Sequence, residues 1–392
     1  MTIFANARLI LPDGIRDGLE IVVADGKIAE IRNRSNAEAI DLGGSYLAPG
    51  FIDLHVHGAA GRDAMEAAPE AFHAICDYHA SGGTTSLLLT TATAPIPEIL
   101  EVLRAVRTCR HEFKQIAGVH VEGPFISRKR AGAQRPEFIR NPEPQVVEQL
   151  LEYADVIQRV TLAPELPGAL EAIDCLGSQN IAVSGGHSDA WDEEARGAFE
   201  HGMRQVTHTF NCMSSMHRRN GERVAGLLEF ALSEPEILCE LIADGHHVSN
   251  TLMKMLYRAK GSQGICLVTD ATAGAGLPEG AAFTLAGADC MVSGGACWLA
   301  DRSALAGGAA RMIDLVRTMV RQVGVPLPEA IAMASANPSK ALRLSTKGRL
   351  EAGADADFVV LSADLEVRQT FVAGAEVYRN PTAPQSVALP KE

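Results

Sequence analysis

Apolar runs and amphipathic stretches alternate through the middle of the chain. Short runs rich in Val, Ile, Leu and Thr have the length of buried strands. Stretches with apolar residues three or four positions apart follow many of them and predict helices. The predicted strands are 50–57, 84–91, 116–123, 156–165, 181–188, 205–211, 240–248 and 264–272, and the helices include 70–80, 98–113, 145–154 and 310–323.

This alternation predicts a (β/α)8 TIM-type barrel, a fold of the α/β class. Eight strands with intervening helices are what such a barrel requires. A doubly wound open sheet is the competing architecture, but no GxGxxG segment follows the first strand to bind a dinucleotide. In a barrel the chemistry lies at the carboxyl ends of the strands, so those positions are the first place to look for function.

The two ends of the chain have a different pattern from the middle. Residues 2–46 and 356–380 contain short alternating segments broken by tight turns, several of them at Asp-Gly or Ala-Gly. Neither end alone makes a plausible core. We therefore expect both ends to meet in a small β-sandwich domain formed by residues 1–48 and 346–392, with the barrel formed by residues 49–345.

Composition and charge narrow the possible partners. A chain of 392 residues with 47% hydrophobic residues can fill one large core and one smaller core. The net charge of -13 argues against a nucleic-acid partner, which would require clustered Lys and Arg. Eight cysteines without a CxxC pair predict reduced thiols. No run has transmembrane length and no signal segment opens the chain, so the sequence predicts a cytoplasmic protein without a membrane partner.

Six of the predicted strands end in residues that bind metals or carry protons. They are His55 and His57 on the first strand, Glu122 on the third, His187 on the fifth, His208 on the sixth, His247 on the seventh and Asp270 on the eighth. Taken singly, a histidine here is more often structural than a ligand, and each carboxylate has an ion pair or a helix cap as its ordinary explanation. Their coincidence at one end of a barrel favours convergent metal binding, because unpaired buried charge is costly.

Imidazole and carboxylate ligands suit Zn, Fe and related divalent ions. Glu122, His187 and His208 would form a three-ligand site that leaves a position open for water, and His55 and His57 could hold a second ion. Asp270 is then the expected general base and acid. Such a centre, with one or two ions, would hydrolyse an amide or a related bond.

The order of these residues resembles the amidohydrolase superfamily. His55 and His57 match its HxH on the first strand, His187 and His208 its histidines on the fifth and sixth, and Asp270 its aspartate on the eighth. Many members carry a carboxylated lysine on the fourth strand, but this chain has "RVTLAPE" there. Instead, "HVEGPF" at 120–125 resembles the N-acetylglucosamine-6-phosphate deacetylases, in which that glutamate is the metal ligand. "GGHS", "THTFNCM", "IADGHHV", "LVTDATAGAG" and "GRLEAGADADFVVL" follow in family order.

This resemblance implies roles for further residues. It implies that Asn211 and Cys212 contact the sugar phosphate, that His247 contacts the sugar, and that an arginine near Arg219 binds the phosphate. In the loop "RAGAQ", Ala133 and Gln134 occupy substrate-binding positions, with Gln134 where the family has a histidine that polarises the acetyl carbonyl. The loop "RRNGERVAG" also departs from the family, so Arg218 and Arg223 remain alternatives to Arg219. Homologues are usually dimers, in which this arginine can serve the partner's site.

The resemblance implies deacetylation of N-acetylglucosamine 6-phosphate to glucosamine 6-phosphate and acetate. Two alternatives remain open at this point. One keeps the centre and changes the substrate to another N-acyl hexosamine, such as N-acetylgalactosamine 6-phosphate, or to an N-acyl amino acid. The other is a non-catalytic scaffold that has kept the barrel, which the full set of ligands and Asp270 disfavours.

Overall fold

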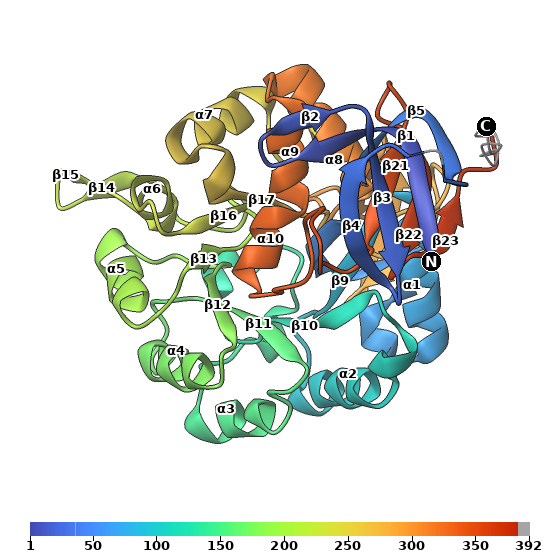
Figure 1. The fold of residues 1–392 in the computed structure, drawn as a ribbon. Coiled ribbons are helices and arrows are strands. Elements are labelled where there is room, and N and C mark those ends of the chain that lie inside the picture. The colour runs from blue at the N-terminus through green and yellow to red at the C-terminus, as the bar shows by residue number, and fades with distance from the viewer. Residues whose placement is uncertain (36, 383–392) are drawn as a thin grey trace.

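The central element is a sheet of parallel strands, described by a computed structural model that covers residues 1–35 and 37–382. Its strands are β6 (Phe51–Val56), β9 (Thr84–Thr91), β10 (Ile116–Glu122), β11 (Ile157–Leu162), β12 (Ala182–Gly185), β13 (Gln205–Val206), β16 (Leu238–Leu241) and β17 (Ile265–Leu267). They pair in chain order, and a parallel bridge between Val56 and Ala271 brings the last strand back to the first. The predicted TIM-type barrel is confirmed (Figure 1).

Helices cover the outside of this barrel (Figure 1). They are α1 (Pro69–Ser81), α2 (Ile96–Cys109), α3 (Pro144–Leu151), α4 (Ala169–Ser178), α5 (Asp192–Glu200), α6 (Leu227–Ser233), α7 (Asn250–Lys260), α8 (Met312–Thr318), α9 (Leu327–Ala334) and α10 (Ala336–Ala341). Each long helix buries one apolar face; in α2 that face contains Ile99, Val102 and Val106. Within the described residues, no helix combines the length and the apolar character needed to cross a membrane.

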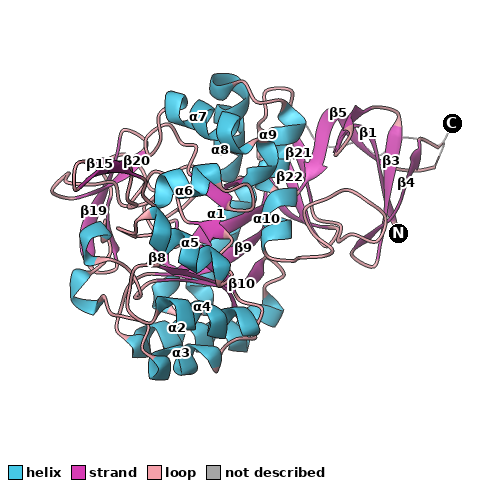
Figure 2. Ribbon diagram, turned by 90° about the vertical axis from the view of Figure 1, so that its left-hand side faces the viewer, coloured by secondary structure: helices cyan, strands magenta, loops and turns pink. Residues whose placement is uncertain are grey.

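Strands from both ends of the chain form a second sheet beside the barrel. They are β1 (Thr2–Leu11), β2 (Gly14–Arg16), β3 (Leu19–Ala24), β4 (Lys27–Asn33), β5 (Ile40–Pro49), β21 (Phe358–Leu361), β22 (Val367–Val372) and β23 (Ala375–Arg379). The two ends join where β5 pairs with β21, and Figure 2 shows the sheet on the far side of the helices from β19 and β20. The limits 1–48 and 346–392 stay a prediction, and residues 383–392 lie outside the described part of the chain.

An aromatic cluster explains why the two ends stay together. Phe4 on β1 packs edge-on against Phe358 on β21 and Phe371 on β22, with ring centroids 5.0 and 5.1 Å away. Phe358 and Phe371 are stacked at 4.7 Å, and all three rings are buried. Because aromatic rings bury large apolar areas, separating the ends would expose this cluster to water.

Two insertions that the apolar pattern did not predict extend from the barrel. A hairpin of β14 (His217–Arg219) and β15 (Glu222–Val224) follows β13, and a three-stranded sheet of β18 (Ala282–Leu285), β19 (Ala288–Ser293) and β20 (Ala296–Leu299) follows β17. Both insertions follow the carboxyl ends of barrel strands. Insertions at this end are positioned to shape a site there.

Candidate metal centre

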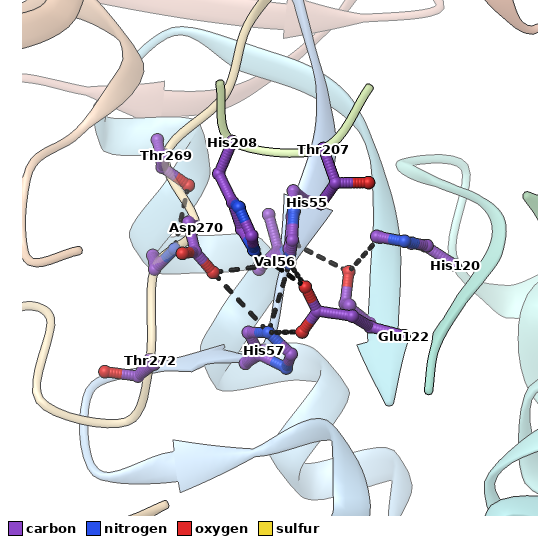
Figure 3. A network of polar contacts seen from close by, with 12 residues as sticks. His55, Val56, His57, His120, Glu122, Thr207, His208, Thr269, Asp270 and Thr272 are labelled. Carbon is purple, nitrogen blue, oxygen red and sulfur yellow. Dashed lines mark hydrogen bonds and ion pairs between the residues drawn. The ribbon is translucent and has the colours of Figure 1, made fainter. Parts of the chain in front are cut away.

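The ligand candidates converge at the carboxyl ends of the barrel strands. His55 lies in β6 and His57 just after it, Glu122 is the last residue of β10, and His187, His208 and Asp270 follow β12, β13 and β17. Figure 3 shows His55, His57, Glu122, His208 and Asp270 turned toward one another. His187, His208 and Asp270 have left-handed backbones, with φ of 46°, 30° and 49°. Such conformations are uncommon outside glycine and cluster at functional sites.

One group of three ligands is formed by Glu122, His187 and His208. The Nε2 atoms of the two histidines lie 3.1 Å apart, and Glu122 Oε1 lies 3.3 Å from His187 Nε2 and 3.2 Å from His208 Nε2. All three side chains are almost fully buried.

A second group is formed by His55, His57 and the same Glu122. The Nε2 atoms of His55 and His57 lie 3.2 Å apart. Glu122 Oε1 lies 3.4 Å from His55 Nε2, and Oε2 lies 3.2 Å from His57 Nε2. Glu122 therefore lies beside all four histidines and could serve as a ligand in either group.

The hydrogen-bond partners of His187 and His208 are those expected of metal-binding histidines. His187 Nδ1 is 2.8 Å from the Arg130 carbonyl oxygen and His208 Nδ1 is 3.2 Å from the Asn211 carbonyl oxygen. Carbonyl oxygens only accept, so each Nδ1 carries a hydrogen and each Nε2 faces Glu122. With both Nδ1 atoms bonded in this way, His187 and His208 would hold a divalent cation through Nε2, together with Glu122.

The electrostatics of Glu122 agree with this interpretation. Burial alone would raise the pKa of Glu122, but the surrounding histidines outweigh it and hold the pKa well below its usual value. The carboxylate is therefore ionised, which is the state that binds a metal. Gln134 donates a hydrogen bond of 2.6 Å from Nε2 to Glu122 Oε2 and accepts one of 2.7 Å from the Thr93 backbone N–H. This glutamine orients the shared carboxylate.

Asp270 lies beside the second group. Its Oδ1 atom is 3.3 Å from His55 Nε2 and 3.5 Å from His57 Nε2, and its side chain is partly exposed to the cavity. A carboxylate at this point can reach both a ligand position and a molecule in the cavity, which is what a general base requires.

A cavity of about 210 Å³ opens directly above these groups. The residues predicted from the resemblance that line it are Ala133, Gln134, Asn211, Cys212 and His247. The metal-binding candidates His57, Glu122, His187 and His208 also line it, together with the expected general base Asp270. Leu285 of β18 and Leu305 add an apolar wall from the insertion that follows β17. The site is thus built from barrel and insertion together.

His247 is held at the cavity by a neighbouring carboxylate. Its Nδ1 atom is 2.7 Å from Asp244 Oδ2, and the backbone N–H of His247 donates to Asp244 Oδ1 at 2.9 Å. Burial opposes charging of the ring, but the hydrogen bond and the charge of Asp244 prevail and raise the pKa of His247 above its usual value. A charged His247 would offer a strong donor to a bound polar group.

Arg219 does not lie with the other predicted residues. It belongs to the β14–β15 hairpin and is absent from the cavity lining. Its Nη2 atom donates to Glu193 Oε1 at 2.5 Å, and its guanidinium lies 4.5 Å from the centre of the Trp191 ring. Of the alternatives, Arg218 is also on β14 and Arg223 on β15, and neither lines the cavity.

Comparison with known proteins gives the family of the chain. The Amidohydrolase family profile matches residues 46–377. An N-acetylglucosamine-6-phosphate deacetylase from Lysinibacillus sphaericus is 36% identical over 382 residues, covering 95% of this chain and 96% of that protein. The chain belongs to the N-acetylglucosamine-6-phosphate deacetylase family of amidohydrolases. An N-acetylgalactosamine-6-phosphate deacetylase from Escherichia coli O157:H7 is 35% identical over 372 residues, covering 94% of this chain and 97% of that protein.

Solved structures of the deacetylase family share the whole fold. An N-acetylglucosamine-6-phosphate deacetylase from Pasteurella multocida matches with a TM-score of 0.91 and 32% identity, covering 97% of this chain and 100% of that chain. One from Mycobacterium smegmatis, determined with N-acetyl-D-glucosamine-6-phosphate, matches with a TM-score of 0.90 and 29% identity, covering 96% and 99%. The amidohydrolase superfamily is metal-dependent, and the two ligand groups of this chain fit that chemistry.

The contacts that hold the site together were not predicted. Asp244 stands three residues before His247 in "DGHH", a spacing that would have suggested the pair. The bond from Gln134 to Glu122, and the carbonyl oxygens of Arg130 and Asn211 that orient the ligand rings, join loops that are distant in sequence or irregular in conformation. No periodic pattern signals contacts of that kind.

Proposed function

We propose that this protein hydrolyses the acetamide of N-acetyl-D-glucosamine 6-phosphate, giving D-glucosamine 6-phosphate and acetate. The observation that carries the proposal is the meeting of two histidine–glutamate groups and Asp270 at one cavity, in a chain similar to deacetylases over 95% of its length. Deacetylation of N-acetylgalactosamine 6-phosphate is the second candidate, because a relative with that name is nearly as similar.

We propose a divalent metal, Zn or Fe, as the cofactor. Glu122, His187 and His208 would hold the principal ion, and His55 and His57 with Glu122 would hold a second ion when two are present. When bound, a divalent ion would supply Lewis-acid activation, which lowers the pKa of water to about 7.

Asp270 is the proposed proton carrier. Its carboxylate takes a proton from the attacking water and then delivers it to the amide nitrogen as the carbon–nitrogen bond breaks. The water oxygen ends in acetate and the transferred proton ends on the amine nitrogen. Oδ1 of Asp270 lies 3.3 Å from His55 Nε2 and 3.5 Å from His57 Nε2, and this position supports a proton carrier beside the ligands.

The cavity lining suggests how the sugar is held. His247 would donate to a sugar hydroxyl, since Asp244 keeps the ring oriented and raises its pKa. Asn211 and Cys212 are proposed contacts of the sugar phosphate, and Ala133 and Gln134 of the acetamide side. Gln134 already donates one amide hydrogen to Glu122, so the other is free for the acetyl carbonyl.

We also propose a cytoplasmic homodimer in which Arg219 binds phosphate in the partner's site. Within one chain Arg219 does not line the cavity, and it lies on a hairpin with exposed Met216 at its base. The guanidinium of an arginine pairs well with phosphate oxygens. On binding, Arg219 would exchange its contact with Glu193 for one with the more highly charged phosphate.

The function is tested with a panel of acylated substrates. The purified protein supplied with Zn or Fe should release acetate fastest from N-acetylglucosamine 6-phosphate, compared with N-acetylgalactosamine 6-phosphate, unphosphorylated N-acetylglucosamine and an N-acetyl amino acid. Acetate is measured by a coupled assay and the free amine by derivatisation. Faster release from the galactosamine epimer would replace the proposal by the second candidate, and no release from any member would refute both.

The Arg219→Ala variant tests the phosphate contact. We expect KM for the phosphorylated substrate to rise about 10- to 100-fold, because a hydrogen bond to a charged group contributes about 1.5–3 kcal/mol. The KM for the unphosphorylated sugar should not change. Arg218→Ala tests the alternative on the same strand, since Arg218 is exposed and, among the described residues, donates to the Gly221 carbonyl. An unchanged ratio in Arg219→Ala, or a change in Arg218→Ala alone, would remove Arg219 from this role.

A further inference from the structure

A buried ion pair lies inside the barrel, next to the metal ligands. Arg159 of β11 is fully buried, and its Nη1 atom donates to Oε1 of Glu240 on β16. Its Nη2 atom donates to Ser184 Oγ at 2.7 Å. The interior of such barrels is usually filled by branched apolar side chains. In many proteins the free energy needed to remove such a pair from water exceeds what the pairing recovers. Stability alone therefore does not explain this ion pair.

The other oxygen of Glu240 faces the metal ligands. Glu240 Oε2 accepts a hydrogen bond of 3.1 Å from the backbone N–H of His208 and lies 3.4 Å from His55 Nδ1. His208 belongs to the first ligand group and His55 to the second. One carboxylate outside both groups therefore touches a member of each. It meets His55 at the opposite ring nitrogen from the one that faces Glu122.

We propose that Glu240, held in place by Arg159, is a positioning residue that sets both ligand groups. Glu240 accepts a hydrogen bond from His55 Nδ1, and this tautomer leaves the Nε2 lone pair free for an ion. It also restrains the backbone of His208, which has the uncommon φ of 30°. This inference rests on the proposed metal-dependent function.

The three partners of Glu240 explain why the residue must be a carboxylate. Arg159, the His208 N–H and His55 Nδ1–H all donate, so the group between them must accept at both oxygens. A glutamine has the same shape but presents one oxygen and one NH₂. Whichever way the amide is turned, its NH₂ group faces one of these donors. When the NH₂ faces His55 Nδ1, it favours the tautomer of His55 in which Nε2 carries the hydrogen. Glu240→Gln is therefore a probe of the same size with the opposite effect on His55.

The test measures Co²⁺ binding by the apoprotein, followed by visible absorption and metal analysis. We expect Glu240→Gln to bind Co²⁺ about 10- to 100-fold more weakly, the loss typical of partners that orient metal ligands. Glu20→Gln is the matched control, because Glu20 is also fully buried and paired with an arginine, Arg32 at 2.7 Å, but lies in the small sheet. Glu240→Gln with the Co²⁺ affinity, stoichiometry and spectrum of the unmodified protein would overturn the inference.

A double variant separates positioning from folding. Arg159→Met with Glu240→Leu removes both charges at once and leaves no unpaired ion, so the melting temperature should fall less than in a variant that removes only one of the two charges. We expect Co²⁺ binding to weaken all the same, because His55 and His208 lose their acceptor. Unmodified Co²⁺ binding by the double variant would refute the inference even if Glu240→Gln fails to fold. An unmodified protein that binds Co²⁺ but releases no acetate would refute the proposed function instead.

Discussion

Replacing Asp270 by asparagine should lower kcat for acetate release by about 10²- to 10⁴-fold, the contribution typical of a general acid and base. The amide cannot take a proton from water or return one to the leaving nitrogen. Asparagine suits the test because it tolerates the left-handed backbone, φ 49°, at this position. Steady-state kinetics gives the effect, while metal analysis and the melting temperature show whether centre and fold persist.

A matched control for Asp270→Asn is Asp289→Asn, since Asp289 is exposed on β19 of the insertion that borders the cavity. This control should retain full activity. Turnover by Asp270→Asn at the rate of the unmodified protein, with metal bound, would show that another group carries the proton. A variant that has lost its metal would instead assign Asp270 to ion binding.

Glu122→Gln should remove both the metal and the activity. Glu122 contacts all four histidines, whereas glutamine is neutral and presents only one oxygen to ligands on both sides. We expect metal affinity to fall by more than about 100-fold, beyond the loss caused by residues that only orient ligands. Metal analysis after dialysis and the acetate assay measure the two effects together.

Glu148→Gln makes the same change on an exposed face of α3 and should have no effect on either measurement. A Glu122→Gln variant with unchanged metal content and kcat would contradict a shared ligand. Retention of one ion and loss of the other would show that the two groups bind independently, with Glu122 needed for only one of them.

The sequence predicted the barrel and the gathering of its ligands because both follow from short-range patterns. Apolar runs mark the strands, and parallel strands place their carboxyl ends together, so His55, Glu122, His187, His208 and Asp270 had to meet. The three-stranded insertion at 282–299 was missed, because its strands are short and half exposed.

Contacts across the barrel interior were beyond prediction for a different reason. Arg159 stands out as a charge in the apolar strand "IQRVTL", yet its partner Glu240 is on another strand three places along the sheet. The role of Arg219 came from the family resemblance, and its contacts with Trp191 and Glu193 depend on how the hairpin packs. Such pairings are set by tertiary geometry, which local periodicity does not encode.

The pairing of β5 with β21 has a consequence for biosynthesis. On the ribosome the first five strands emerge early, but the strand that covers the edge of β5 is translated only after the whole barrel. Until then a nascent chain presents an open, apolar sheet edge, the kind of surface that seeds aggregation. Premature termination anywhere before Phe358 would leave that edge permanently uncovered, so we expect truncated products to depend on chaperones or to be degraded.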